Sequence, residues 1–199
     1  MRTIILVPII HTEKDMGSLL ESVKQEYVRQ HGVQKWFDHL KSIDEVWTGI
    51  EQMITLLELP YSLVRLYQDG LPLCGKEIDI IRDVAAQGSK NHQLLLKIFE
   101  QGARLMGTED PLLLLQEYQF HQRELRDGSH GHEKQREENR RLLLARDRFI
   151  SERINATLLD GEIGLLFLGL AHDVEALFKA DILVTHLLPS LRERQEQTK

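Results

Sequence analysis

The chain has 199 residues, of which 42% are hydrophobic and 28% charged, with a formal net charge of −6 and an isoelectric point near 5.9. This length suits one domain that buries about 70% of its unfolded surface, so folding needs no disulfide or metal. A mildly acidic chain is a poor candidate for nucleic-acid binding, which requires a basic face. The single cysteine, Cys74, cannot form an internal disulfide, which fits a reducing compartment.

The N-terminal run of residues 3–10 is apolar and rich in isoleucine. It faintly resembles a signal peptide, but Pro8 interrupts it, no small-residue cleavage site follows, and charged residues come next. No apolar run reaches the roughly 18 residues that a membrane helix needs. We therefore expect a buried strand at 3–10 in a cytoplasmic protein without a membrane partner.

The rest of the chain alternates between helical periodicity and short apolar runs. Turn signals such as residues 68–72 and 107–111 separate these segments. Apolar spacing predicts helices at 16–30, 33–59, 77–86, 91–101, 112–126, a long one that ends near 161, and a short one at 173–179. Apolar runs predict further strands at 62–67, 103–106, 164–168 and 182–187.

This order of elements predicts an α/β fold with a mostly parallel central sheet flanked by helices. We expect a single domain over residues 1–190, in which about 112–160 form a helical insertion or arm, and a flexible charged tail at 191–199. An apolar stripe with Trp36 and Trp47 is more typical of core, but it leaves a homo-oligomer interface open.

Candidate site residues follow the predicted strands, because sites in open α/β sheets form at the carboxyl ends of strands. The residues in these positions are His11, Glu13 and Asp15, then Asp69, then Thr108, Glu109 and Asp110, then His172 and Asp173, with His186 near the end of the last strand.

Two of the strands end alike, in His11 and in His172, each three residues beyond a rigid or small residue, Pro8 or Gly169. Histidine titrates near neutrality, so it can serve as a general acid or base, and its neutral ring binds divalent metals. Either histidine alone is more simply a packing residue. The two together favour a functional site.

A metal site is one form that this site can take. His11, Glu13 and Asp15 alternate along an extended segment, and with His172 they offer a mixed nitrogen and oxygen ligand set for Mn²⁺, Zn²⁺ or Co²⁺. The alternative is that Glu13 and Asp15 only stabilise the start of the next helix. No nucleotide cofactor is expected, because the glycine spacing fits neither a dinucleotide fingerprint nor a phosphate loop.

The segment from Arg146 to Ile154, followed by Gly161 and by a strand that ends in Gly169-Leu170-Ala171-His172, resembles the TraB/TIKI and erythromycin esterase-like (ChaN-like) superfamily. There, an arginine-led helix precedes a strand that ends in Gly-x-x-His, and an earlier strand often carries a similar motif. In this chain proline replaces that first glycine before His11. The resemblance implies an α/β fold with metal-dependent peptidase or esterase activity. It also implies site roles for His172, His11, Arg146 and one acidic residue, either Asp69 or Glu109.

The sequence therefore predicts a metal-assisted or His/carboxylate hydrolase of a small ester, amide or peptide bond. His11 and His172 would be ligands or acid–base groups; Glu13, Asp69 or Glu109 would be the base, and Arg146 would stabilise developing negative charge. The alternative is a non-catalytic protein that binds a small molecule or peptide, or regulates a partner through the charged helical region 116–152.

Overall fold

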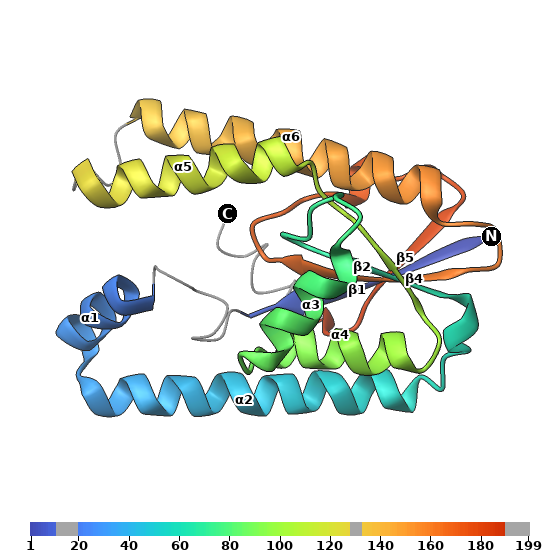
Figure 1. Ribbon diagram of the computed structural model, residues 1–199, viewed down its shortest axis with the longest axis horizontal. Helices are drawn as coiled ribbons and strands as arrows, with labels where there is room; N and C mark the ends of the chain where they lie inside the picture. Colours follow the sequence, from blue (N-terminus) through green and yellow to red (C-terminus); the bar gives the residue numbers. More distant parts are fainter. Residues whose placement is uncertain (11–19, 128–132, 190–199) are drawn as a thin grey trace.

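The computed structural model describes residues 1–10, 20–127 and 133–189. Its centre is a five-stranded sheet in the order β3-β2-β4-β1-β5, in which every pair of neighbouring strands is parallel (Figure 1). The strands are β1 (Arg2–Ile9), β2 (Val64–Gln68), β3 (Arg104–Met106), β4 (Ile163–Gly169) and β5 (Ile182–His186). This arrangement confirms the predicted α/β fold, and each strand begins and ends within two residues of its predicted position.

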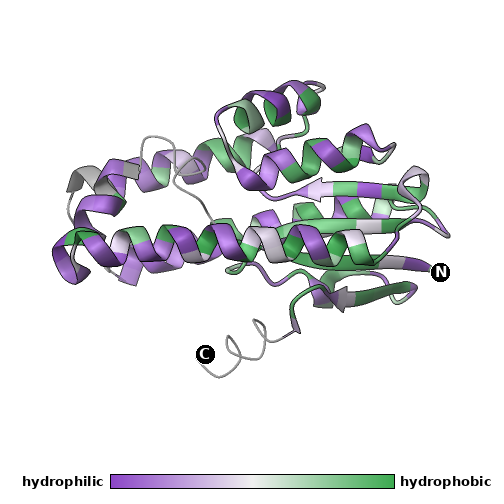
Figure 2. Cartoon of the chain, turned by 90° about the horizontal axis from the view of Figure 1, so that it is seen from below, coloured by the Kyte–Doolittle hydropathy of each residue, from purple (hydrophilic) through white to green (hydrophobic). Residues whose placement is uncertain are grey.

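The strands are apolar because helices cover both faces of the sheet, as is usual for parallel sheets. Side chains alternate between the faces along each strand. Ile5 and Val7 of β1 point to one face, whereas Ile4 and Leu6 point to the other. Figure 2 shows the strands as largely hydrophobic and the surrounding helices as banded with polar residues.

Six α-helices surround the sheet among the described residues, with α2, α3 and α4 on one side and α5 and α6 on the other (Figure 1). Their bounds are α1 (Leu20–His31), α2 (Val33–Leu56), α3 (Glu77–Ala86), α4 (Lys90–Glu100), α5 (Pro111–Asp127) and α6 (Glu133–Thr157). Ile50 of α2 and Leu95 of α4 lie in one core, and Ile150 and Ile154 of α6 lie in the other.

The C-terminal half of α6 packs on the sheet, so part of the expected arm at 112–160 is a cover for the core. The N-terminal half of α6 pairs with α5, and this hairpin extends past the sheet (Figure 1). The division into one domain with an insertion stays a prediction. The expected tail at 191–199 lies outside the described residues.

The helix expected at 173–179 is a single 3₁₀ turn, Glu175–Leu177. Side chains of α6 make hydrogen bonds with backbone groups at both ends of this segment. Asp147 accepts a hydrogen bond from the Asp173 N–H, and the Asn155 amide pairs with the Leu177 carbonyl and the Lys179 N–H. These contacts replace the bonds of a longer helix.

Both tryptophans are buried within the chain. Trp47 donates to the Ile10 carbonyl at 2.9 Å, and Trp36 packs against Tyr27 of α1. Most of the apolar stripe of α2 is therefore buried, whereas Phe37 is 57% exposed, and homo-oligomerisation stays a prediction. Among the described helices, none has both the length and the apolar character that crossing a lipid bilayer requires.

Candidate functional site

The turns after β2 and β3 are hydrogen-bonded to each other at the carboxyl edge of the sheet. The N–H groups of Thr108 and Glu109 both donate to the Leu71 carbonyl at 3.0 Å. Gly70, at φ +77°, lets the chain turn sharply after Asp69 and aims its own N–H at Glu109 Oε1, 2.7 Å away. This connection brings Asp69 and Glu109 to one point.

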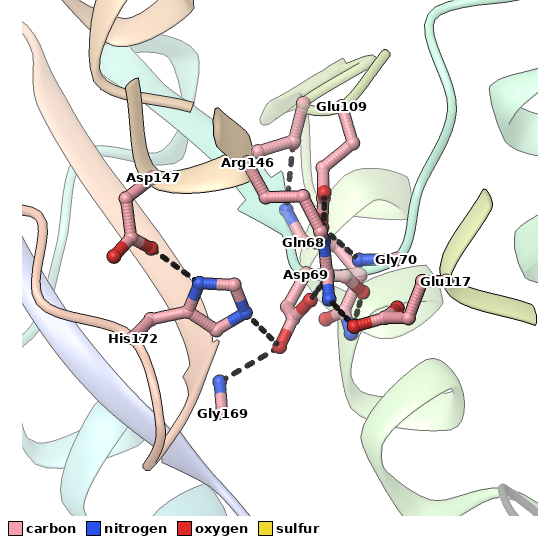
Figure 3. Close-up of polar contacts among 10 residues, drawn as sticks. Gln68, Asp69, Gly70, Glu109, Glu117, Arg146, Asp147, Gly169 and His172 are labelled. Atoms are coloured by element: carbon pink, nitrogen blue, oxygen red, sulfur yellow. Dashed lines mark hydrogen bonds and ion pairs between the residues drawn. The ribbon is translucent and has the colours of Figure 1, made fainter. Parts of the chain in front are cut away.

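Arg146 of α6 lies between three carboxylates (Figure 3). Its Nε and Nη2 donate to the two oxygens of Glu109 at 2.6 Å, Nη2 donates to Asp69 Oδ1 at 2.5 Å, and Nη1 donates to Glu117 of α5. Four of the five guanidinium N–H groups are therefore occupied by carboxylates of the described chain. In this structure Arg146 positions acidic groups.

His172 lies between two further carboxylate contacts (Figure 3). Its Nδ1 is 2.5 Å from Asp147 Oδ1, and its Nε2 is 3.4 Å from Asp69 Oδ2. The second oxygen of Asp147 accepts from the Asp173 N–H at 3.2 Å, which fixes that carboxylate. Asp147 therefore orients the ring, and Nε2 is the nitrogen that faces Asp69.

Asp69 connects the two halves of the site. Besides Arg146 and His172, it contacts the Gly169 N–H, which donates to Asp69 Oδ2 at 2.9 Å. A Cβ atom at position 169 would come within 2.7 Å of this oxygen. A side chain at position 169 would therefore displace the Asp69 carboxylate, because the backbone of the Gly-x-x-His turn approaches it directly.

We refer to Asp69, Glu109, Glu117, Arg146, Asp147 and His172 as the ion-pair cluster. Burial by itself lowers the pKa of His172, but its hydrogen bonds to Asp147 and Asp69 outweigh burial and raise the pKa to about 9. Burial opposes ionisation of Asp69 as well, yet His172 and Arg146 hold its pKa well below the usual range. At neutral pH, His172 is thus an imidazolium beside a carboxylate.

The pKa of Glu109 is raised, in contrast to that of Asp69. Burial raises its pKa, Arg146 opposes the rise, and the neighbouring charge of Asp69 adds to it. Glu109 is fully buried, so it is a second place in the cluster where a proton can reside.

A cavity of about 930 Å³ opens over the ion-pair cluster between the α5–α6 hairpin and helices α3 and α4. Asp69, Glu117, Arg146 and His172 line it, so the cluster is in contact with the cavity. Aliphatic side chains supply another part of the wall: Ile9, Ile10, Ile80, Val84, Leu143 and Leu170. This volume suits a ligand of small-molecule or short-peptide size.

The structure brings together four of the predicted site residues, Asp69, Glu109, Arg146 and His172. His11, Glu13 and Asp15 lie outside the described residues, and their roles stay predictions. The parallel register pairs Ile9 with Gly169, so β1 does end at the same edge as β4.

The side chains of the other strand-end residues do not join the ion-pair cluster. His186 contacts Glu175 at 3.1 Å, and Asp110 accepts from the Leu112 N–H at the start of α5. Thr108 accepts from the Gln68 N–H at 3.0 Å and so connects β2 to the turn after β3. Asp173 contributes its backbone N–H to Asp147.

Sequence reasoning missed Asp147 and Glu117, because both lie on helices and not at strand ends. A signal for Asp147 was present in the spacing of α6. Asp147, Ile150, Ser151 and Ile154 recur at helical intervals, and all four are buried. Glu117 had no comparable signal, because the part of α5 that follows its apolar first turn is mainly polar.

The described residues meet the requirements of a metal site only in part. His172 Nε2 and Asp69 Oδ2 are 3.4 Å apart, and two ligands of a tetrahedral ion with bonds of about 2.1 Å are separated by about that distance. Asp147 on Nδ1 matches the carboxylate that often supports a metal-bound histidine. However, within the described part of the chain no group of three or more His, Cys, Asp or Glu side chains is arranged to hold an ion.

No protein-family model matches the chain, and no curated protein or solved structure matches it significantly. The resemblance to the TraB/TIKI and erythromycin esterase-like superfamily therefore stays a prediction.

Proposed function

We propose that the protein hydrolyses a small ester, amide or peptide bond, with His172 as the proton-transfer group. The observation that carries this proposal is the Asp147–His172–Asp69 series of contacts, of which His172 and Asp69 line the cavity. A histidine held by one carboxylate and facing a second is a typical acid–base arrangement.

The ionisation states suggest the roles. His172 holds a proton at neutral pH, so it donates from Nε2 to the oxygen or nitrogen of the leaving group. Asp69, an ionised carboxylate, accepts a proton from the attacking water as its bond to the acyl carbon forms, because the water is then far more acidic than free water. The 3.4 Å contact between Asp69 and His172 then lets the proton return to the imidazole, so that water is added across the bond and both groups are restored.

Arg146 would support this reaction indirectly, since most of its N–H groups hold carboxylates. Its remaining N–H could also donate to the oxyanion of the tetrahedral intermediate. In either role, loss of Arg146 would leave the buried charges of Asp69 and Glu109 uncompensated.

A divalent ion is a second form of the same proposal, favoured by the 3.4 Å spacing of His172 Nε2 and Asp69 Oδ2. Mn²⁺, Zn²⁺ or Co²⁺ at these atoms would supply Lewis-acid activation of water. Because the ion competes with the His172 proton, its affinity should rise as the pH increases toward 9.

The test uses p-nitrophenyl acetate and amino-acid p-nitroanilides, assayed with EDTA and with each metal added back. We expect hydrolysis by the wild-type protein and a loss of about 10²- to 10⁴-fold in His172→Gln. The control is His186→Gln, because His186 lies on β5 and does not line this cavity. The rate of hydrolysis should fall as the pH rises through about 9, because His172 then loses the proton that it donates.

Two results would overturn the proposal. One is equal activity in the wild-type and His172→Gln proteins. The other is no hydrolysis of any substrate in the presence of any of the three metals, which favours a ligand-binding protein that retains the cavity without catalysis. A rate that rises through pH 9 would instead assign His172 as a general base.

A further inference from the structure

The ion-pair cluster carries more negative than positive charge. It contains four carboxyl groups, on Asp69, Glu109, Glu117 and Asp147, and two groups that can carry a positive charge, Arg146 and His172. Acidic groups therefore outnumber basic groups by two. An excess of acidic groups on the wall of a cavity attracts positively charged ligands, so the cavity suits a cationic group.

Glu117 is the carboxylate that is placed to receive such a group. Its side chain is 25% exposed, whereas those of Asp69, Glu109 and Asp147 are 11% exposed or less. Oε1 accepts from Arg146 Nη1, but Oε2 has no hydrogen-bond donor among the described residues. Because Glu117 lines the cavity, Oε2 is available to a ligand.

An independent observation comes from two amides that also line the cavity, Gln68 of β2 and Asn91 of α4. They are 3% and 1% exposed, and Gln68 Oε1 and Asn91 Oδ1 have no donor in the described structure. The Gln68 amide cannot be reversed without loss, because its Nε2 donates to the Asp69 carbonyl at 2.9 Å. Buried acceptors without donors are rare in native proteins and indicate a missing partner that carries N–H or O–H groups.

We propose that the cavity takes a substrate with a protonated primary amine, which Glu117 Oε2 binds, while Gln68 and Asn91 accept from other N–H groups of the same molecule. The substrate class is then an aminoacyl ester or amide, with its hydrocarbon part against Ile80, Val84 and Leu143. The reaction at the acyl group rests on the proposed function, but recognition of the amine does not.

The recognition is tested by calorimetry with leucinamide and with N-acetyl-leucinamide, which lacks the charge. Binding is measured in the EDTA-treated wild-type protein and in His172→Gln, where hydrolysis should not consume the ligand. We expect leucinamide to bind at least about tenfold more tightly than its acetylated form. Glu117→Gln should weaken leucinamide binding by about 10- to 100-fold, as expected for a hydrogen bond to a charged group.

The variant is close to isosteric, and its amide oxygen can still accept from Arg146, so folding should be retained. Glu124→Gln is the matched control, because Glu124 lies on the same helix with the same 25% side-chain exposure and does not line the cavity. Asn91→Leu, checked for folding by circular dichroism, should also weaken leucinamide binding.

The two proposals fail in different ways. Equal binding of leucinamide and N-acetyl-leucinamide, or no effect of Glu117→Gln, overturns the amine site even if hydrolysis occurs. Binding of Mn²⁺ alone, with no binding of leucinamide, overturns it as well. Glu117-dependent binding of leucinamide without hydrolysis supports the amine site and removes the hydrolase proposal.

Discussion

Protonation of His172 should make the stability of the fold depend on pH in a way that one substitution can isolate. The pKa of His172 is about 9 in the folded protein, against about 6.5 for an unperturbed histidine. A group whose pKa is raised by folding stabilises the folded state fully below its unfolded pKa. That stabilisation is lost as the pH rises through the folded pKa.

The shift sets the size of the effect. A difference of about 2.5 in pKa, at 1.36 kcal/mol for each unit, corresponds to about 3 kcal/mol of stability. This contribution should be complete below pH 6.5 and absent above pH 9. For a chain of this length, such a loss corresponds to a Tm decrease of roughly 6–12 °C.

The assay is urea unfolding of the wild-type and His172→Gln proteins at intervals from pH 5.5 to 9.5. His172→Gln also loses packing and hydrogen bonds, but that loss does not vary with pH. The difference in unfolding free energy between the two proteins should therefore shrink by about 3 kcal/mol between pH 6.5 and 9. A difference that stays constant across this range would refute the assignment of a proton to His172.

Two further substitutions test other parts of the structure. Gly169→Ala places a methyl group 2.7 Å from Asp69 Oδ2, so the carboxylate must move away, and we expect about a 10²-fold loss of hydrolysis together with a lower Tm. Gly49→Ala, on α2, is the control and should leave hydrolysis unchanged, because an added Cβ there meets no atom within 4 Å. Ile50→Ala, at a fully buried position of α2, should lower the unfolding free energy by about 3 kcal/mol, measured by urea denaturation. Leu56→Ala, 80% exposed on the same helix, should change it by less than about 0.5 kcal/mol, and similar losses in both variants would contradict the assigned packing of α2.

The fold was predictable because its strands are buried on both faces. Runs such as 164–168 are apolar without interruption, and the order of strands and helices then implies parallel pairing. The bounds of α2 were less accurate. Apolar residues continue to Leu59, but the helix ends at Leu56, and Glu58 adopts a positive φ of 48°. The spacing of apolar residues does not by itself indicate where the backbone leaves the helical conformation.

The grouping of the candidate site residues was predictable as far as it depends on strand ends. Asp69, Glu109 and His172 each follow a strand, and parallel strands place their carboxyl ends at one edge. Asp147 and Glu117 reach this edge from helices, so their positions depend on how α5 and α6 pack. The raised pKa of His172 was also not predictable from the sequence, because it results from the hydrogen bonds that Asp147 and Asp69 make with the buried ring.

Arg146 and Asp147 are consecutive on α6, and they hold different parts of the site. Successive residues of a helix point about 100° apart, so Arg146 reaches the turns after β2 and β3 while Asp147 reaches the turn after β4. Inserting or deleting one residue between Asp147 and the end of α6 would rotate both side chains away from their partners. The described N-terminal residues of α6, from Glu133 to Glu138, include no member of the ion-pair cluster, so substitutions there should leave the geometry of the cluster unchanged.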